Sequence, residues 1–136
     1  MSSFKIFDIA GSGMSAQSVR LNTVASNLAN ADSVSGDPNN VYRARHPVFQ
    51  AVMGGTDLGT AQVNVTGIAQ SQTAPETRYD PGNPLADAQG NVYAPNVNVV
   101  EEMADMISAS RSYQNNVEVL NTSRDMMLAT LKLGQS

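Results

Sequence analysis

The chain has 136 residues, a formal net charge of −4, no cysteine and no tryptophan. The length suits one domain, or one domain with a small insert. Without cysteine there are no disulfides, thiolate nucleophiles or cysteine-ligated metals. The negative charge argues against a nucleic-acid partner, which needs a basic surface. Aromatic residues make up only 5% of the chain. We therefore expect its burial to be completed by a partner.

Residues 1–31 predict a long N-terminal helix. Their only apolar run, residues 4–10, contains Asp8, so we expect no cleaved signal peptide, and no stretch is long enough for a membrane span. From Phe7 onward, mostly apolar positions recur in steps of three and four, as a and d positions of a coiled coil do. This stripe consists of Phe7, Ala10, Met14, Gln17, Leu21, Val24, Leu28 and Ala31.

The remaining faces of this helix carry almost no charge. Arg20 is the only charged residue between positions 9 and 31, and the others are mostly Ser, Asn, Thr, Gln and Ala. An exposed helix normally carries Lys, Glu and Arg. We therefore expect protein on most sides of it in the working state. Gly11 and Gly13 weaken a helix interior, which close packing or a bend would justify.

The middle segment, residues 32–96, holds all six prolines and seven of the ten glycines. Its alternation predicts short strands at residues 41–52, 62–66 and 92–93, with tight turns at 80–84. Pro47 indicates an edge strand or a bulge in the first of them. So little strand with so much loop is marginal alone, and we expect it to lean on the helices or on a neighbour.

Residues 97–136 predict a second helix, over about residues 99–133. Asn98 with Glu101 fits a capping-box start, and Gly134 fits a C-cap. A looser stripe runs through Met103, Met106, Ser110, Tyr113, Val117, Leu120, Arg124, Met127 and Leu131, and a second one through Val100, Ile107, Met126 and Leu128. An ordinary two-helix core would explain these stripes too. The uncharged first helix favours a multi-subunit assembly.

The predicted fold is mainly α with a small β insert. Residues 1–31 and 97–136 form a helical core domain, in which the two long helices pair as an antiparallel coiled coil. Residues 32–96 form a loop-rich insert with a short, hairpin-like β element.

No group of residues predicts catalysis, cofactor binding or metal binding. His46 is the only histidine, so a two-histidine metal site is impossible. Four turn residues invite a calcium hypothesis, but their spacing does not match the calcium-loop pattern; they are Asp80, Asn83, Asp87 and Asn91. We therefore predict that the chain is not an enzyme and holds no cofactor.

Three sequence blocks carry a family resemblance. The first is residues 22–32 (NTVASNLANAD), which is similar to the pattern N-x-x-A-x-N-x-A-N-A. The second is residues 80–87 (DPGNPLAD), followed by Gly90 and Pro95. The third comprises residues 98–103 (NVVEEM) and 106–117 (MISASRSYQNNV). Together they resemble the flagellar basal-body rod proteins, and most closely the C-type proximal rod subunit.

One departure from the family pattern refines this resemblance. Most axial relatives continue the first block into a Thr-x-Gly-Tyr turn, whereas here a small insertion separates Gly36 from Tyr42. Together with the short middle region, this favours a proximal rod subunit over hook and distal rod proteins.

The resemblance implies a structural subunit of the proximal rod in the flagellar basal body. Such subunits are exported unfolded by the flagellar type III apparatus, without a cleaved signal peptide. They polymerise helically in the periplasm into the drive shaft that transmits motor torque and encloses the export channel. The implied partners are further copies, other rod subunits, the rod-base adaptor, the membrane-ring base and the export apparatus.

The residues predicted to pack between subunits lie on the two helices. Asn is a weak helix former, so we expect the amides of Asn27 and Asn30 to bond to neighbouring backbones; alternatively, Asn30 only caps its helix. The predicted set is Phe7, Met14, Leu21, Val24, Asn27, Leu28, Asn30, Met103, Met106, Ile107, Tyr113, Val117, Leu120, Met127 and Leu131.

Two rival classes remain open. One is another axial subunit or a membrane-active translocator of a type III secretion system; the translocator would need a basic polar face on its helices. The other is a hydrolase attached to secretion machinery, which would need a cluster of acid, base or nucleophile.

Overall fold

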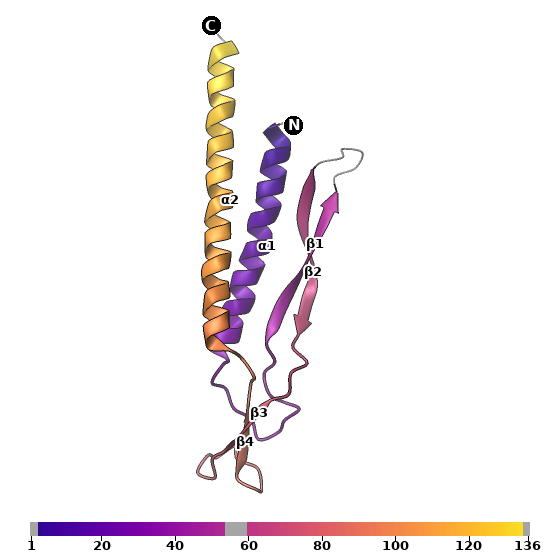
Figure 1. Cartoon of the computed structure of the whole chain (residues 1–136), viewed down its shortest axis with the longest axis vertical. Helices are drawn as coiled ribbons and strands as arrows, with labels where there is room; N and C mark the ends of the chain where they lie inside the picture. Colours follow the sequence, from indigo (N-terminus) through magenta and orange to yellow (C-terminus); the bar gives the residue numbers. More distant parts are fainter. Residues whose placement is uncertain (1–2, 54–59, 135–136) are drawn as a thin grey trace.

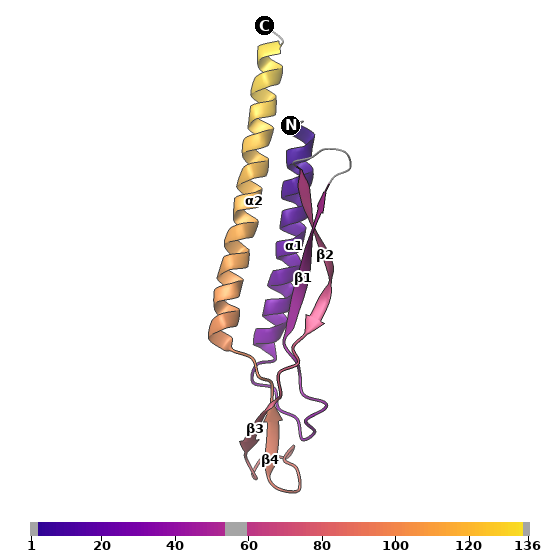
Figure 2. The same ribbon diagram turned by 45° about the vertical axis from the view of Figure 1, so that its right-hand side comes forward.

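A computed structural model describes residues 3–53 and 60–134 of the chain. The chain begins with a long helix, α1 (Ser3–Ala29), and ends with another, α2 (Val99–Gly134); the strands lie between them in the sequence. They run antiparallel side by side, and the strands lie beside and below them (Figures 1 and 2). The prediction of a mainly α fold with a small β insert is confirmed. None of the helices in these ranges is long and apolar enough to cross a membrane.

Helix α1 ends two residues before the predicted limit at position 31. The backbone N–H of Asn30 still donates to the Ser26 carbonyl at 3.2 Å, but that of Ala31 donates to Leu28, only three residues back. The Asn30 side chain also donates to Ser26 O, at 2.8 Å. The Ser26 carbonyl, in the last helical turn, thus accepts from both the backbone and the side chain of Asn30.

Helix α2 begins where the capping pattern predicts. The side-chain oxygen of Asn98 accepts hydrogen bonds from the backbone N–H groups of Val100 and Glu101, at 3.2 and 3.3 Å. Helix N-termini have four such free donors, and an Asn at this position is among the best acceptors for them. Glu101 and Glu102 in the first turn add favourable charge at the positive end of the helix dipole.

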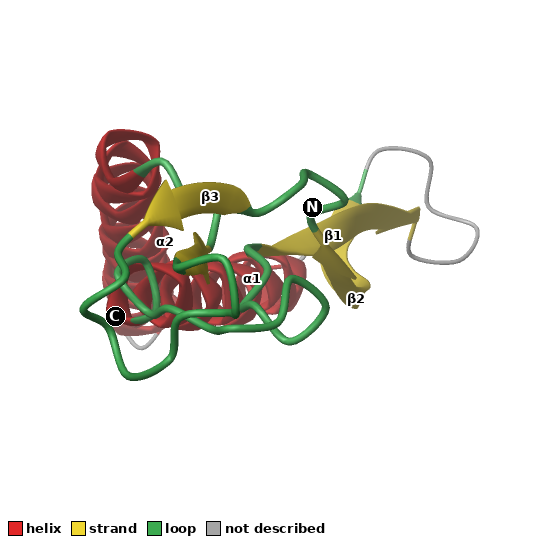
Figure 3. Cartoon of the chain, turned by 90° about the horizontal axis from the view of Figure 1, so that it is seen from below, coloured by secondary structure: helices red, strands yellow, loops and turns green. Residues whose placement is uncertain are grey.

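A twisted hairpin of β1 (Arg45–Met53) and β2 (Ala61–Gln70) packs along α1. Seen from below, α1 lies between α2 and this hairpin (Figure 3). The first strand begins four residues later than predicted, and the second is longer than predicted. A register shift between Val48 and Phe49 lies close to Pro47, where a bulge was one of the two predictions, but the extra residue, Thr66, is in the partner strand β2.

A small lower unit below the helices contains β3 (Glu76–Tyr79) and β4 (Asn91–Ala94), paired antiparallel. Strand β4 was predicted, but β3 was not, because its sequence ETRY has no apolar alternation. Gly90, between them, has φ +82°, a conformation that L side chains rarely adopt. Ser35 forms an isolated bridge with Tyr93, which joins the segment after α1 to this unit.

The interior of the molecule is built from small side chains. The buried apolar residues are all alanine or valine: Ala10, Ala16, Val24, Val41, Ala44, Val92, Ala94 and Ala109. The accessible surface is 9015 Å², whereas a compact monomer of this mass exposes about 6,800 Å². The isolated chain therefore leaves about a third more surface in water than a globular protein of its size.

Candidate functional site

The residues that join the two helices to the hairpin meet around Asn27, near the end of α1. Its amide nitrogen donates to the Arg45 carbonyl at 2.9 Å and to Glu102 Oε1 at 3.0 Å. Its amide oxygen accepts from the Tyr42 hydroxyl and from the Arg45 backbone N–H, both at 2.9 Å. Asn27 is 0% exposed. All four hydrogen-bonding positions of this buried amide are thus satisfied within the chain.

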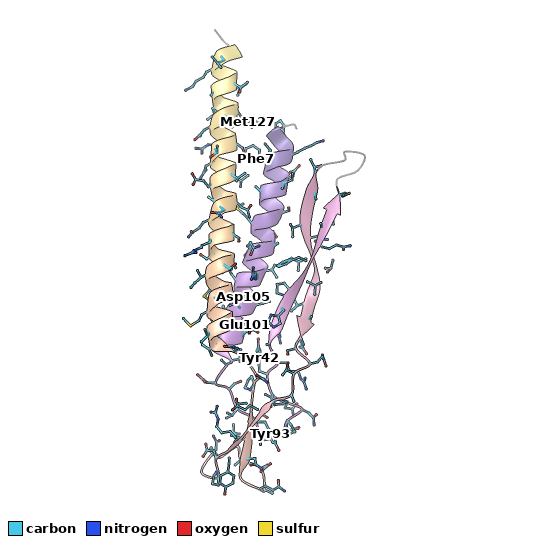
Figure 4. All side chains as sticks on the ribbon, in the orientation of Figure 1. Phe7, Tyr42, Tyr93, Glu101, Asp105 and Met127 are labelled. Carbon is cyan, nitrogen blue, oxygen red and sulfur yellow. The ribbon has the colours of Figure 1, made fainter. Side chains whose placement is uncertain are left out.

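Three separate segments are fixed by this one side chain. Arg45 is the first residue of β1, Tyr42 lies in the loop before it, and Glu102 lies in the first turn of α2. Tyr42 also shares a 3.0 Å hydrogen bond with Ser26, and the Arg45 guanidinium lies 5.6 Å from the centre of the Tyr42 ring. Figure 4 shows Tyr42 at the lower end of the helix pair, near Glu101 and Asp105.

Asn30 behaves differently from Asn27. Its amide bonds back to its own helix at Ser26, as the capping alternative proposed. The expectation of amide-to-backbone bonds to another segment is confirmed for Asn27 only, through Arg45.

A second polar contact crosses the helix pair above this junction. Arg20 Nη2 donates to Asp105 Oδ1 at 2.6 Å, with the two side chains 26% and 38% exposed. Partly exposed ion pairs contribute about 1 kcal/mol or less. This pair therefore fixes the alignment of the helices more than it stabilises them.

The face of α2 that meets α1 keeps the predicted stripe at some positions and is offset from it by one residue at others. Met106, Leu120 and Met127 of the stripe are half-buried. Alongside them lie small or polar residues: Glu102, Ala109, Asn116 and Ser123. Each directly precedes one of the predicted positions Met103, Ser110, Val117 and Arg124. The prediction that the apolar stripe of α2 faces α1 is wrong at these positions, because hydrogen bonds and close approach, rather than apolar burial, select the facing side.

Close approach is visible at Gly13. A Cβ added there would lie 2.9 Å from Asn116 Nδ2, so this glycine permits the helices to touch. Gly11 has no such neighbour within 4 Å, and the structure gives no packing reason for it.

The predicted packing residues divide between the two helices. On α1, Val24 and Asn27 are buried, and the other predicted positions are half-buried: Phe7, Met14, Leu21, Leu28 and, just beyond the helix, Asn30. On α2, Met106, Leu120 and Met127 are half-buried, whereas Met103, Ile107, Tyr113, Val117 and Leu131 are exposed. Their contacts with other subunits stay a prediction.

Sequence reasoning missed Tyr42, Glu102 and Asp105 as parts of this site. Acids in the first turn of a helix are usually exposed, yet Glu102 is only 4% exposed. The available signal was its position opposite Asn27, once the helices are placed antiparallel.

The calcium hypothesis is not supported by the geometry of the lower unit. Asp87 accepts from the backbone N–H groups of Gln89 and Asn91 and from the Tyr93 hydroxyl. Asp80 accepts from the Asn83 amide. The side chains organise turns, and the described residues contain no cluster of three or more potential metal ligands. His46 is exposed in β1.

An elongated two-helix chain, held by a polar junction and exposing apolar side chains, defines a subunit of a larger assembly. Two family profiles match it: the flagella basal body rod protein family over residues 7–36, and the C-terminal family of flagellar basal body rod FlgEFG proteins over residues 88–133.

Relatives that match over their full length identify the family more narrowly than these two profiles do. The chain is 57% identical to flagellar basal-body rod protein FlgC of Escherichia coli O6:H1, over 99% of this chain and 100% of the relative. Identity is 56% to FlgC of Salmonella typhimurium over the same shares, and 41% to FlgC of Aquifex aeolicus over 97% of each chain. The chain belongs to the FlgC family of flagellar basal-body rod proteins; it is a structural protein and not an enzyme.

Proposed function

We propose that the chain polymerises helically into the proximal rod, through surfaces that are exposed in the isolated subunit. The observation that carries this proposal is the exposed apolar strip on the first half of α2. Val100, Met103 and Ile107 follow one another at helical spacing and are 77%, 53% and 55% exposed. Apolar side chains at this spacing bury against a partner helix, and α1 covers a different side.

The uncovered side of α1 offers a second contact surface. Ser15, Ser18, Asn22, Ala25 and Ala29 are exposed and alternate in steps of three and four. Side chains this small and neutral contribute little to solubility, but they let another helix approach closely. The same stripe is where the sequence lacks charge.

We further propose that the helix pair continues as a coiled coil in the rod. Residues 1–31 and 97–136 would form the helical core domain there, and residues 32–96 the insert outside it. The alternating stripe on α1 supports this arrangement, and neighbouring copies supply the apolar surface that α2 does not find in its own chain.

This proposal extends to the route and role of the subunit. The chain is exported unfolded, without a cleaved signal peptide, and assembles in the periplasm. The resulting rod encloses the export channel and transmits torque. The base adaptor, the membrane-ring base, the export apparatus and other rod subunits are its partners. The small interior supports export, because a chain that buries little by itself unfolds readily.

Replacing Met103 and Ile107 together by Gln tests the proposed contact surface. Both side chains are exposed in the single chain, so the subunit should still be produced and exported. Each side chain exposes about half of its surface in the single chain, so the burial lost by replacing both amounts to about 1.5–3 kcal/mol per subunit. We expect rods to be absent from purified basal bodies and the cells to be non-motile.

The matched control is Ser108→Gln, an exposed position on the same helix that lies off this strip. It should assemble normally. Full motility of the Met103→Gln, Ile107→Gln chain would contradict the proposal.

A further inference from the structure

One oxygen of the buried Glu102 has no partner. Oε1 accepts from Asn27, but Oε2 is buried without a hydrogen bond in the described part of the chain. Leaving a carboxylate oxygen unpaired in a protein interior is costly. Native proteins pair such groups with protein or with ordered water, so the oxygen indicates a donor other than the described residues of the isolated chain.

A cleft of about 340 Å³ lies beside this carboxylate, at the start of α2. Its polar lining consists of Glu101 and Glu102, Asn96 and Asn98, Ser71 and Thr73 after β2, and His46 of β1. A water molecule occupies about 30 Å³ in the liquid, so the cleft has room for a side-chain head group. The paired acids at its wall favour a cation.

Three basic side chains in the described part of the chain suit this cleft and form no ion pair within one copy. Arg78 on β3, and Arg111 and Lys132 on α2, are exposed. Across residues 3–53 and 60–134, no ion pair or hydrogen bond engages these three side chains. All three lie outside the cleft lining.

We propose that this cleft receives a basic side chain from a neighbouring copy of the chain, which donates to Glu102 Oε2. Donor and acceptor then lie on different surfaces of the subunit. A contact of this kind is heterologous, and repeated without closing it generates an open helical filament. The inference rests on the proposed rod assembly and adds one specific contact to it.

Glu102→Gln separates this contact from the internal junction. The Gln oxygen can still accept from Asn27, whereas its amide nitrogen replaces Oε2 and repels a cation's N–H groups. Truncating one side of a buried charge pair weakens association by about 30-fold or more. Basal bodies purified from cells that carry this variant should therefore lose the subunit at a clearly lower urea concentration. Glu118→Gln, which removes the same charge from an exposed site on α2, should leave the wild-type value unchanged.

Two further variants identify the donor and block the cleft. Among Arg78→Gln, Arg111→Gln and Lys132→Gln, one should reproduce the Glu102→Gln effect. Thr73→Arg should place a guanidinium of the same copy at the cleft and weaken assembly while satisfying the acid. A density map of the wild-type rod should show a basic side chain of an adjacent copy at Oε2.

Four outcomes would overturn the inference. Rods of the Glu102→Gln chain could resist urea as well as those of Glu118→Gln, or the Thr73→Arg chain could assemble normally. Alternatively, none of the three substitutions of basic residues could lower the resistance to urea, or the map could show only water or a different rod protein at Oε2. Wild-type chain missing from the rod would instead refute the proposed function. In that case, failure would not depend on the variant.

Discussion

At the scale of single residues, Asn27 shows how a weak helix former becomes the centre of a fold. In a helix interior, Asn is less favourable than Ala by roughly half a kcal/mol. Its four hydrogen bonds join α1 to α2 through Glu102 and to the hairpin through Arg45. Removing the amide would leave several buried groups unpaired at once, which costs about 1–3 kcal/mol for each.

Asn27→Ala should therefore impair rod assembly far more than Asn30→Ala. The first change leaves the buried Glu102 without a hydrogen-bond partner and removes the bonds to the Tyr42 hydroxyl and the Arg45 backbone, at a cost of about 2–4 kcal/mol in all. The second removes one capping bond, at about 1 kcal/mol or less. We expect the Asn27 variant to be exported but scarce in purified basal bodies. Cells with this variant should also swim less far in soft agar than cells with the Asn30 variant.

Asn22→Ala, an exposed amide on the same helix, controls for the loss of an Asn as such. Equal, normal motility of the Asn27 and Asn30 variants would show that the junction does not matter for assembly.

At the scale of elements, the helix pair is matched by shape and polarity as well as by apolar side chains. Gly13 lies against Asn116, Arg20 pairs with Asp105, and half-buried Met and Leu residues of α2 alternate with small ones. Other large apolar side chains of α2 remain exposed. Helix α2 thus carries apolar side chains on two faces, of which only one meets α1.

Gly13→Leu and Gly11→Leu should separate close packing from helix propensity. Leu is the better helix former at both positions, by about 0.8–1 kcal/mol. At position 13 the added side chain collides with the Asn116 side chain and displaces it from the helix contact, whereas position 11 has open space. We expect few rods with Gly13→Leu and more from Gly11→Leu, counted in purified basal bodies; the reverse order would refute this packing.

The lower unit is an element pair whose stability depends on pH. The hydrogen bond from the Asn91 backbone, with those from Gln89 and Tyr93, lowers the pKa of Asp87 below its usual 3.8. The Asp87 hydrogen bond raises the pKa of Tyr93 above 10.0. Folding thus favours the ionised acid and the neutral phenol.

The unit should consequently be most stable between about pH 4 and pH 10. The contribution of Asp87 is complete above its unfolded pKa and is lost as the pH falls through the lowered folded value. That of Tyr93 is complete below pH 10 and is lost as the pH rises through the raised value. NMR titration of both side chains in the full chain checks this. Asp87→Asn should return the Tyr93 pKa toward 10.0; an unchanged value would refute the coupling.

At the scale of the whole molecule, the sequence predicted what depends on local patterns. The stripe on α1 and the Asn98 cap predicted the two helices. Pro47 predicted a bulge in the first strand, whereas the extra residue, Thr66, lies in β2. The strand β3 could not be predicted, because the backbone of β4 selects it rather than its own alternation. The facing side of α2 could not be predicted either, since apolar periodicity does not reveal a polar interface such as that of Glu102.

The small apolar interior also determines how well ordered the helices of the free subunit should be. Its interior of alanine and valine, with an accessible surface of 9015 Å², leaves little apolar burial to offset the conformational entropy of ordering two long helices, at about 1–2 kcal/mol per residue for the backbone. Isolated helices gain most of their stability from tertiary packing. We therefore expect the purified monomer to be largely disordered at both termini and to become helical on assembly.

Amide hydrogen exchange on the monomer measures this directly. Residues 7–31 and 100–131 should exchange rapidly in the free chain and slowly in purified rods. Residues 76–94 of the lower unit are held by local turns and strand pairing, so they serve as an internal comparison and should be protected more than the helices. Strong protection throughout both helices in the monomer would mean that the polar junction and the small core suffice, and that neighbouring copies are not needed to fold this chain.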